Sequence, residues 1–171
     1  VRPHPSTNFS INNNSLCLRG NSFVLTNNST ISSGNYTSLW NFGDNTASTN
    51  SSSSHTYGSV GNFIVKLVTT SDYGCKDSLS STVYVRPHPL TDFNIDDSSQ
   101  CLAGNLFSFT NASSISSGSY TPNWNFGDNA ISTGTSPLHN YTSIGAFNVR
   151  LVTTSNYGCK DSLTKNVYVR P

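Results

Sequence analysis

The sequence predicts an all-β protein made of two tandem β-sandwiches, and three observations support this prediction. Ser, Thr and Asn account for 72 of the 171 residues while Glu and Met are absent, a composition that disfavours helices. The chain matches itself without a gap when position 1 is set against position 85. Apolar and polar residues alternate in several short stretches, which is the pattern of strands with one buried face.

The internal repeat defines the domain organisation. Pairing positions 1–87 in order with positions 85–171 gives 55 identities in 87 pairs. Residues 1–5 return as 85–89, and residues 169–171 match the opening of a third copy. A unit of this length can bury its own core, unlike the shorter repeats of solenoid proteins. We therefore predict two domains, residues 1–86 and 87–171, each with about seven strands.

The two copies also show which positions each strand keeps apolar. Positions 23 and 25 stay apolar in both copies, whereas Val24 between them becomes Ser108. The alternation fails between Leu79 and Val83, because it would place Lys165 inside, so we expect a bulge or a frayed strand start there. The predicted inward positions of the first copy are Phe9, Ile11, Phe23, Leu25, Trp40, Phe42, Phe63, Val65, Leu67, Val83 and Val85, with their counterparts in the second copy.

The four cysteines, Cys17, Cys75, Cys101 and Cys159, allow three pairings. None of them forms the closely spaced pair that is typical of structural zinc sites. The repeat symmetry favours one disulfide within each domain, Cys17–Cys75 and Cys101–Cys159, each worth about 4 kcal/mol of stability in the chain-entropy model. Because disulfides persist in oxidising compartments, we expect an extracellular or cell-surface location.

Three motifs follow one another in each copy and carry a family resemblance. Their residues are Trp40, Phe42, Gly43, Asp44, His55, Tyr57 and Gly61 in the first copy, and Trp124, Phe126, Gly127, Asp128, His139, Tyr141 and Gly145 in the second. In order and spacing they resemble the PKD (polycystic kidney disease) domain. The stretch 74–77, which contains a cysteine, resembles the PKD-like domains of very large secreted or surface proteins of Bacteroidetes-type bacteria. The resemblance implies an Ig-like β-sandwich used in extracellular multidomain proteins.

Two details of these motifs lead to structural expectations. The family has a glycine directly after the aspartate, whereas this chain has Asn45 and Asn129. Asn tolerates a left-handed backbone conformation, so we expect the turn to survive. His55 and Tyr57 lie two residues apart on one strand face, so we interpret them as a ring pair that braces the next strand, and we expect a structural rather than a catalytic role for both histidines.

The sequence predicts a protein that is not an enzyme. Its eight acidic residues are all aspartates, most of them in predicted turns, and no G-x-S-x-G nucleophile motif occurs. A net charge of +1 without a basic cluster argues against nucleic-acid binding. No apolar run approaches the roughly 20 residues that cross a bilayer, which argues against membrane insertion. We expect no cofactor.

Three ligand or modification hypotheses stay open. Asp92, Asp96 and Asp97 form an oxygen-rich cluster that suits calcium, although the first copy has asparagines at the equivalent positions. Some tyrosines are not part of the predicted core and are candidates for stacking on glycans. They stand at positions 36, 73 and 84 and at the equivalent positions of the second copy. Ser78 and Ser162 stand in Asp-Ser-Leu sequences that resemble the O-glycosylation pattern associated with Bacteroidetes.

The joint between the copies indicates what the tandem is for. Arg86, Pro87, His88 and Pro89 follow the last strand of the first copy directly. Two prolines in three residues favour a short, extended, semi-rigid joint. We predict a non-enzymatic structural repeat in the rod-like stalk or filament of an extracellular adhesin, with neighbouring repeats, and other chains in a fibre, as partners. The alternative is a carbohydrate- or protein-binding module.

Overall fold

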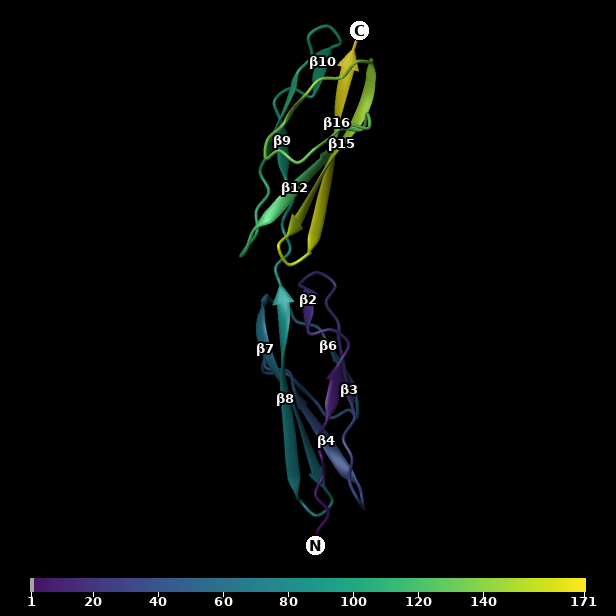
Figure 1. The fold of residues 1–171 in the computed structure, drawn as a ribbon, viewed down its shortest axis with the longest axis vertical. Helices are drawn as coiled ribbons and strands as arrows, with labels where there is room; N and C mark the ends of the chain where they lie inside the picture. Colours follow the sequence, from purple (N-terminus) through teal and green to yellow (C-terminus); the bar gives the residue numbers. More distant parts are fainter. Residues whose placement is uncertain (1) are drawn as a thin grey trace. The chain divides into compact units, whose positions relative to one another are not determined.

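The computed structural model describes residues 2–171, which form two compact units, one ending at Arg86 and the other beginning at Pro87. Val1, the first residue of the predicted first domain, lies outside the described residues. Every regular element within residues 2–171 is a strand, so the predicted all-β class is confirmed (Figure 1). No helix within residues 2–171 has the length and apolar character needed to cross a bilayer.

Each unit has eight strands among its described residues, one more than the predicted seven or so. The strands of the first unit are β1 (Phe9–Ile11), β2 (Ser15–Cys17), β3 (Phe23–Asn27), β4 (Tyr36–Asn41), β5 (Ala47–Ser48), β6 (Ser53–His55), β7 (Gly61–Ser71) and β8 (Lys76–Arg86). Those of the second unit are β9 (Phe93–Ile95), β10 (Ser99–Cys101), β11 (Phe107–Asn111), β12 (Tyr120–Asn125), β13 (Ile131–Ser132), β14 (Leu138–His139), β15 (Gly145–Ser155) and β16 (Lys160–Arg170).

The strands of each unit form two sheets. In the first unit these are a three-stranded sheet in the order β1-β3-β6 and a five-stranded sheet in the order β2-β8-β7-β4-β5. The second unit repeats both orders, as β9-β11-β14 and β10-β16-β15-β12-β13. The named strands pair antiparallel except β2 with β8 and β10 with β16, which are parallel. One core packed between two sheets makes each unit a β-sandwich.

The core of each unit lies between its two sheets, at the positions that the alternation predicts. Nine of the eleven predicted inward residues of the first unit are buried, and the other two, Ile11 and Phe63, are partly buried against them. The second unit repeats this pattern, with Ile95 and Phe147 partly buried. Tyr57 also belongs to the core, at 2% exposure, and the alternation alone did not include it.

The bulge or frayed start expected between Leu79 and Val83 is wrong. β8 pairs with β7 in one continuous register from Lys76 to Val85, and β16 pairs with β15 in the same way. Lys165 does face inward, but its long aliphatic stem carries the ammonium group to the sheet edge, where it donates a hydrogen bond to the carbonyl of Phe93. The strand therefore stays regular without burying a bare charge.

The last strand of each unit connects its two ends. At the end where the chain enters, which we call the N-end, the Thr7 N–H donates to the carboxylate of Asp77 at 2.7 Å. At the opposite end, the C-end, Cys17 pairs with Arg86, the final residue of β8. β8 has eleven residues, so the two ends lie about 33 Å apart at ~3.3 Å per residue. The second unit has the same contacts at the equivalent positions.

Candidate functional site

The most detailed shared feature of the two units is the turn that leaves β4, and it starts with a glycine. Gly43 has φ 82°, and a Cβ there would lie 2.7 Å from the carbonyl oxygen of Ile64 on β7. The Asn41 side chain accepts a hydrogen bond from the Gly43 N–H at 2.9 Å. Asn45 adopts φ 69°, which confirms that asparagine takes the left-handed position in this turn.

Asp44 points from this turn to His55 on β6. The His55 Nε2 and Asp44 Oδ2 atoms lie 2.7 Å apart. The imidazole stacks on the Phe42 ring at 4.2 Å between centroids and meets the Tyr57 ring edge-on at 4.6 Å. Tyr57 in turn stacks on Phe63 of β7 at 4.0 Å. The predicted ring pair that braces the next strand is therefore confirmed, and it belongs to a stack of four rings.

A buried asparagine holds the backbone beyond this stack, and sequence reasoning missed it. The Asn21 Nδ2 group donates to the carbonyls of Leu18 and Tyr57, and its Oδ1 accepts from the Tyr57 N–H at 2.8 Å. The Tyr57 hydroxyl donates to the carbonyl of Phe42 at 2.7 Å. The available signal was that Asn21 returns unchanged as Asn105, within a stretch where neighbouring residues vary.

The environment fixes the charge of the carboxyl and of the phenol. Burial raises the pKa of Asp44, but hydrogen bonds from Thr46 and His55 outweigh it and hold the pKa below its ordinary value. Burial, with the nearby Asp44 charge, raises the pKa of Tyr57 well above its ordinary value. At neutral pH the site therefore combines an ionised acceptor with a neutral hydroxyl donor.

Thr46, His55 and Asp44 have the residue types of a nucleophile–base–acid triad, but their geometry excludes it. The Thr46 hydroxyl lies 3.4 Å from His55 Nε2, the same nitrogen that faces Asp44. A triad needs the nucleophile and the acid on opposite ring nitrogens. The hydroxyl already donates to Asp44 at 2.5 Å, so these contacts tie the turn to β6.

The second unit repeats the arrangement without the hydroxyl. His139 Nε2 lies 2.7 Å from Asp128 Oδ2, and its ring stacks on Phe126 at 4.1 Å. Ala130 replaces Thr46 and contributes only its N–H, which donates to Asp128 at 3.0 Å. Burial raises the pKa of Asp128, and the hydrogen bonds from His139 and Ala130 overcome this and lower it. A threonine-dependent activity is therefore not common to both units.

The disulfides predicted within each unit, Cys17–Cys75 and Cys101–Cys159, are wrong. Cys75 and Cys101 are free thiols, whereas Cys17 and Cys159 are disulfide-bonded. The reason is the length of the last strand. Cys17 lies beside the C-end of β8 and Cys75 just before its N-end, about 33 Å away, whereas a disulfide needs Cα atoms within about 7 Å.

The structure does not gather Asp92, Asp96 and Asp97 into a cation site. Among residues 2–171 no three His, Cys, Asp or Glu side chains are placed to hold a metal ion. Asp92 accepts from the Lys165 ammonium at 3.3 Å, Asp96 from the N–H groups of Asp97 and Ser108, and Asp97 from a backbone N–H. The Ser108 and Asp97 N–H groups lower the pKa of Asp96. Each carboxylate thus supports a local turn or strand edge.

Of the four predicted linker residues, Arg86 is the last residue of β8 and the other three follow it directly. β8 ends at Arg86, residues 87–89 belong to no strand, and Leu90 already forms a β-bridge with Ser114. The Arg86 guanidinium lies over the Tyr84 ring at 4.6 Å, and its Nε donates to Ser15. The connection between the two units is therefore made by Pro87, His88 and Pro89.

The predicted modification and stacking residues differ in accessibility. Ser78 and Ser162 are both exposed, so a glycosyl group would find them accessible. Tyr36 is half-buried and its hydroxyl donates to the carbonyl of Ser29 at 2.9 Å, so its ring belongs to the fold rather than to a ligand platform. Tyr73 and Tyr168 expose about half of their surface, 54% and 49%.

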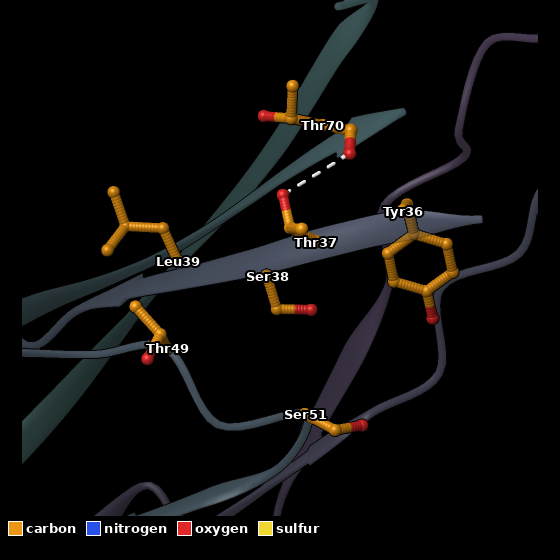
Figure 2. Close-up of a pocket in the computed structure, with 7 residues that line it drawn as sticks. All are labelled: Tyr36, Thr37, Ser38, Leu39, Thr49, Ser51 and Thr70. Atoms are coloured by element: carbon orange, nitrogen blue, oxygen red, sulfur yellow. Dashed lines mark hydrogen bonds between the residues drawn. The ribbon is translucent and has the colours of Figure 1, made fainter. Parts of the chain in front are cut away.

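One groove runs along the free edge of β4 in the first unit. Figure 2 shows it between β4, which contributes residues 36–39, and the segment that carries Thr49 and Ser51. Its volume is about 630 Å³. β4 pairs with β5 only at its last two residues, so the edge before them has no strand partner on that side. The second unit has Pro122 and Asn123 at two of these positions, so this lining is not repeated.

Comparison with known proteins identifies the family to which the chain belongs. A family model described as PKD domain matches twice, at residues 5–87 and 88–171. The solved PKD1 domain of Vibrio anguillarum Epp is 25% identical, with a TM-score of 0.43, and the match covers 48% of this chain and 94% of that one. The PKD1 domain from the Vibrio cholerae metalloprotease PrtV is 30% identical, with a TM-score of 0.43, covering 48% and 96%. A comparison with curated protein sequences finds no match.

Proposed function

Because the chain belongs to the PKD domain family, with two tandem copies that fill almost its whole length, we propose that it is a structural segment of a larger extracellular protein. PKD domains are non-catalytic modules, and this pair would form part of the rod-like stalk or filament of a bacterial adhesin. Its partners would be neighbouring repeats and, in a fibre, other copies of the chain. The Asp-Ser-Leu serines would carry surface glycans that keep such a stalk soluble.

One observation carries this proposal: the chain enters each unit at its N-end and leaves it at its C-end. β8 runs the full length of the first unit, and only residues 87–89 separate it from the second. Prolines at 87 and 89 restrict the backbone of that connection. A repeat with its termini at opposite ends and a short, stiff joint extends a chain without folding it back on itself.

Small-angle X-ray scattering of the two-unit chain tests the proposal. A rod requires a maximum dimension above about 70 Å, from two units of ~33 Å plus their loops. The matched control replaces Pro87 and Pro89 with glycine, and both chains are measured with their cysteines reduced so that only the linker is compared. The glycines should broaden the distribution of distances and shorten its mean without unfolding either unit. A compact profile for the natural sequence, unchanged by the glycine substitutions, would contradict the stalk function.

A binding module is the second candidate, and the groove along β4 is the observation that favours it. Leu39 is 47% exposed there, and Thr37, Thr49 and Ser51 add hydroxyl groups to the lining of the same groove, a mixture that suits the edge of a sugar or an extended peptide. Glycan-array screening would test this function, with Leu39→Asn as the matched variant because the second unit has asparagine there. Binding that Leu39→Asn abolishes would favour the module over the stalk, and absence of binding would count against it.

A further inference from the structure

Each unit carries one cysteine at each of its ends. Cys17 and Cys101 lie at the C-ends, in the strands that pair with the last residues of β8 and β16. Cys75 and Cys159 lie at the N-ends, directly before those last strands begin. We call the first pair the C-end cysteines and the second pair the N-end cysteines. Neither unit can close a disulfide between its own two cysteines, because the strand between them is too long.

The oxidation states form a pattern across the repeat. The C-end Cys17 and the N-end Cys159 are disulfide-bonded. Their equivalents in the other unit, Cys101 and Cys75, are free, the former exposed and the latter half-buried. Both kinds of position therefore support a disulfide in this chain, and one thiol of each kind is left over.

The free thiols stand on the same backbone frame as the bonded ones. Next to the C-end cysteines, the Leu18 N–H donates to the Arg86 carbonyl at 2.8 Å, and the equivalent bond in the second unit is 2.7 Å. At the N-ends, the Cys75 carbonyl accepts from the Ser71 N–H at 2.9 Å, and the Cys159 carbonyl accepts from its equivalent at 2.8 Å. The backbone around a disulfide-bonded cysteine therefore has the same hydrogen bonds as the backbone around its free equivalent.

We propose that Cys75 and Cys101 are covalent attachment points for further repeats. The C-end Cys101 forms a disulfide with the N-end cysteine of the repeat that follows it, at the position that Cys75 occupies in the first unit, so consecutive repeats are joined by a disulfide as well as by the peptide chain. This inference rests on the proposed function, since head-to-tail neighbours exist only in a repeat array. Pairing of unlike ends also gives the array a direction that the pairing of like ends would not.

The bond-forming step is a two-electron oxidation. The two Sγ–H groups lose their protons and one S–S bond forms between them, while a disulfide oxidant accepts the two electrons. With glutathione disulfide as the oxidant, its S–S bond breaks and two glutathione thiols leave. The oxidising compartment in which this chain is proposed to reside supplies oxidants of that class.

Two single variants of the full chain test the proposal in solution. Cys75→Ser keeps only the C-end thiol free, and Cys101→Ser keeps only the N-end thiol free. One variant is isotope-labelled, the two are mixed in equal amounts in a glutathione redox buffer, and intact-mass spectrometry separates mixed dimers from like-with-like dimers. The same mixture in concentrated urea gives the random ratio, in which mixed dimers about equal the sum of the others. The double variant should give no dimer.

The expected result is an excess of the mixed dimer in the folded state, on the order of tenfold over the ratio in urea, because the bonded cysteines of this chain, Cys17 and Cys159, are one C-end and one N-end cysteine. A folded ratio equal to the urea ratio would overturn the proposal, as would the absence of dimers or the discovery of bridges within single units by peptide mapping. Failure here would leave the stalk function standing, because the scattering test does not depend on the thiols.

Discussion

The two units are identical at 55 of 87 aligned positions, yet they cover the same edge of the core in different ways. In the second unit, the Lys165 ammonium lies 5.0 Å from the centre of the Phe93 ring and pairs with Asp92 at 3.3 Å, and Phe93 is fully buried. The first unit has serine and asparagine at the equivalent positions. A groove of about 550 Å³ remains there, and Phe9 keeps 9% exposure.

The turn after β4 shows the opposite behaviour, because its contacts are nearly the same in both units. The His–Asp distance is 2.7 Å in each, and the histidine ring stacks on the neighbouring phenylalanine at 4.2 Å in the first unit and 4.1 Å in the second. The contacts of the turn are therefore kept in both units, whereas the fold tolerates two different arrangements at the edge beside β1 and β9. Substitutions at both places would test this contrast, and hydrogen exchange read by mass spectrometry resolves each unit separately.

Substitution of the turn glycine should have the largest effect and should be equal in both units. A Cβ at Gly43 would meet Ile64 backbone atoms at 2.7 and 2.9 Å, and one at Gly127 would meet Asn148 backbone atoms at 2.9 and 3.0 Å. Neither strand can move away, so Gly43→Ala and Gly127→Ala should each cost roughly 3 kcal/mol or more in their own unit. Gly58→Ala, where nothing lies within 4 Å, is the matched control. A loss of stability that is no larger than that of the control, or that differs between the two units, would contradict this expectation.

Removal of the histidine should come next, and it should affect the second unit more. Asp44 keeps the Thr46 hydroxyl when His55 is lost, whereas Asp128 keeps only backbone N–H donors when His139 is lost. We expect His139→Ala to destabilise its unit by about 2 kcal/mol and His55→Ala by less. Adding Ala130→Thr to His139→Ala should recover part of the loss, and no recovery would show that the hydroxyl is irrelevant.

The same aspartates predict loss of stability in acid. Their pKa values are lower in the folded state, so their contribution is present above the unfolded value of about 4 and is lost as the pH falls through the folded value. Unfolding free energy measured against pH should fall in that window. Asp128→Asn should flatten the curve for the second unit alone, and an unchanged slope would count against the assignment.

Replacing Lys165 by the serine of the first unit, or Ser81 by the lysine of the second, should have a smaller effect. Each change should make the core edge of one unit resemble that of the other. Lys165→Ser removes the hydrogen bond to the Phe93 carbonyl and exposes the Phe93 ring, so we expect a loss of about 1 kcal/mol in the second unit. Ser81→Lys with Asn8→Asp should stabilise the first unit and close its groove. Equal stability of these variants and the natural chain in urea unfolding would mean that the edge is energetically neutral.

The smallest effect concerns a single amide group. Asn27 Nδ2 donates to the Ser38 hydroxyl at 2.9 Å, but the equivalent Asn111 Nδ2 is buried without a partner among the described residues, because Pro122 replaces the serine. Pro122→Ser should therefore stabilise the second unit by about 0.5–1 kcal/mol, and Ser38→Ala should cost the first unit a similar amount. Destabilisation by Pro122→Ser would show that proline rigidity outweighs the missing hydrogen bond.

The repeat and the alternation were enough to predict the class, the sandwich and most of the core, because both depend on local periodicity. The ring pair also followed from residue type and spacing, whereas the left-handed asparagine followed from the family resemblance, because asparagine stands where the family has glycine. The disulfides did not, because repeat symmetry says which cysteines are equivalent but not at which end of a unit each one lies. That required the parallel pairing of β2 with the end of β8, a long-range contact with no local signal.

Lys165 and the aspartates illustrate a second limit. A lysine at an inward position predicts an interrupted strand, whereas its flexible stem carries the charge past the core and the strand continues. Asp92, Asp96 and Asp97 are close in sequence, but they have separate partners: Asp92 accepts from Lys165, Asp96 from the Ser108 N–H, and Asp97 from the nearby Ser99 N–H. Where a side chain ends depends on neighbours that only the folded chain brings close.

The parallel pairing of β2 with β8 has a mechanical consequence. Tension applied to the two termini of a unit reaches β2 from one side and β8 from the other, and it pulls these two strands past each other along their length. Their hydrogen bonds are then loaded together rather than opened one by one from an end. The pairing between β2 and β8 should therefore carry most of the unit's resistance to stretching. Under a pulling force, the unit would unfold at the rate at which these hydrogen bonds break together.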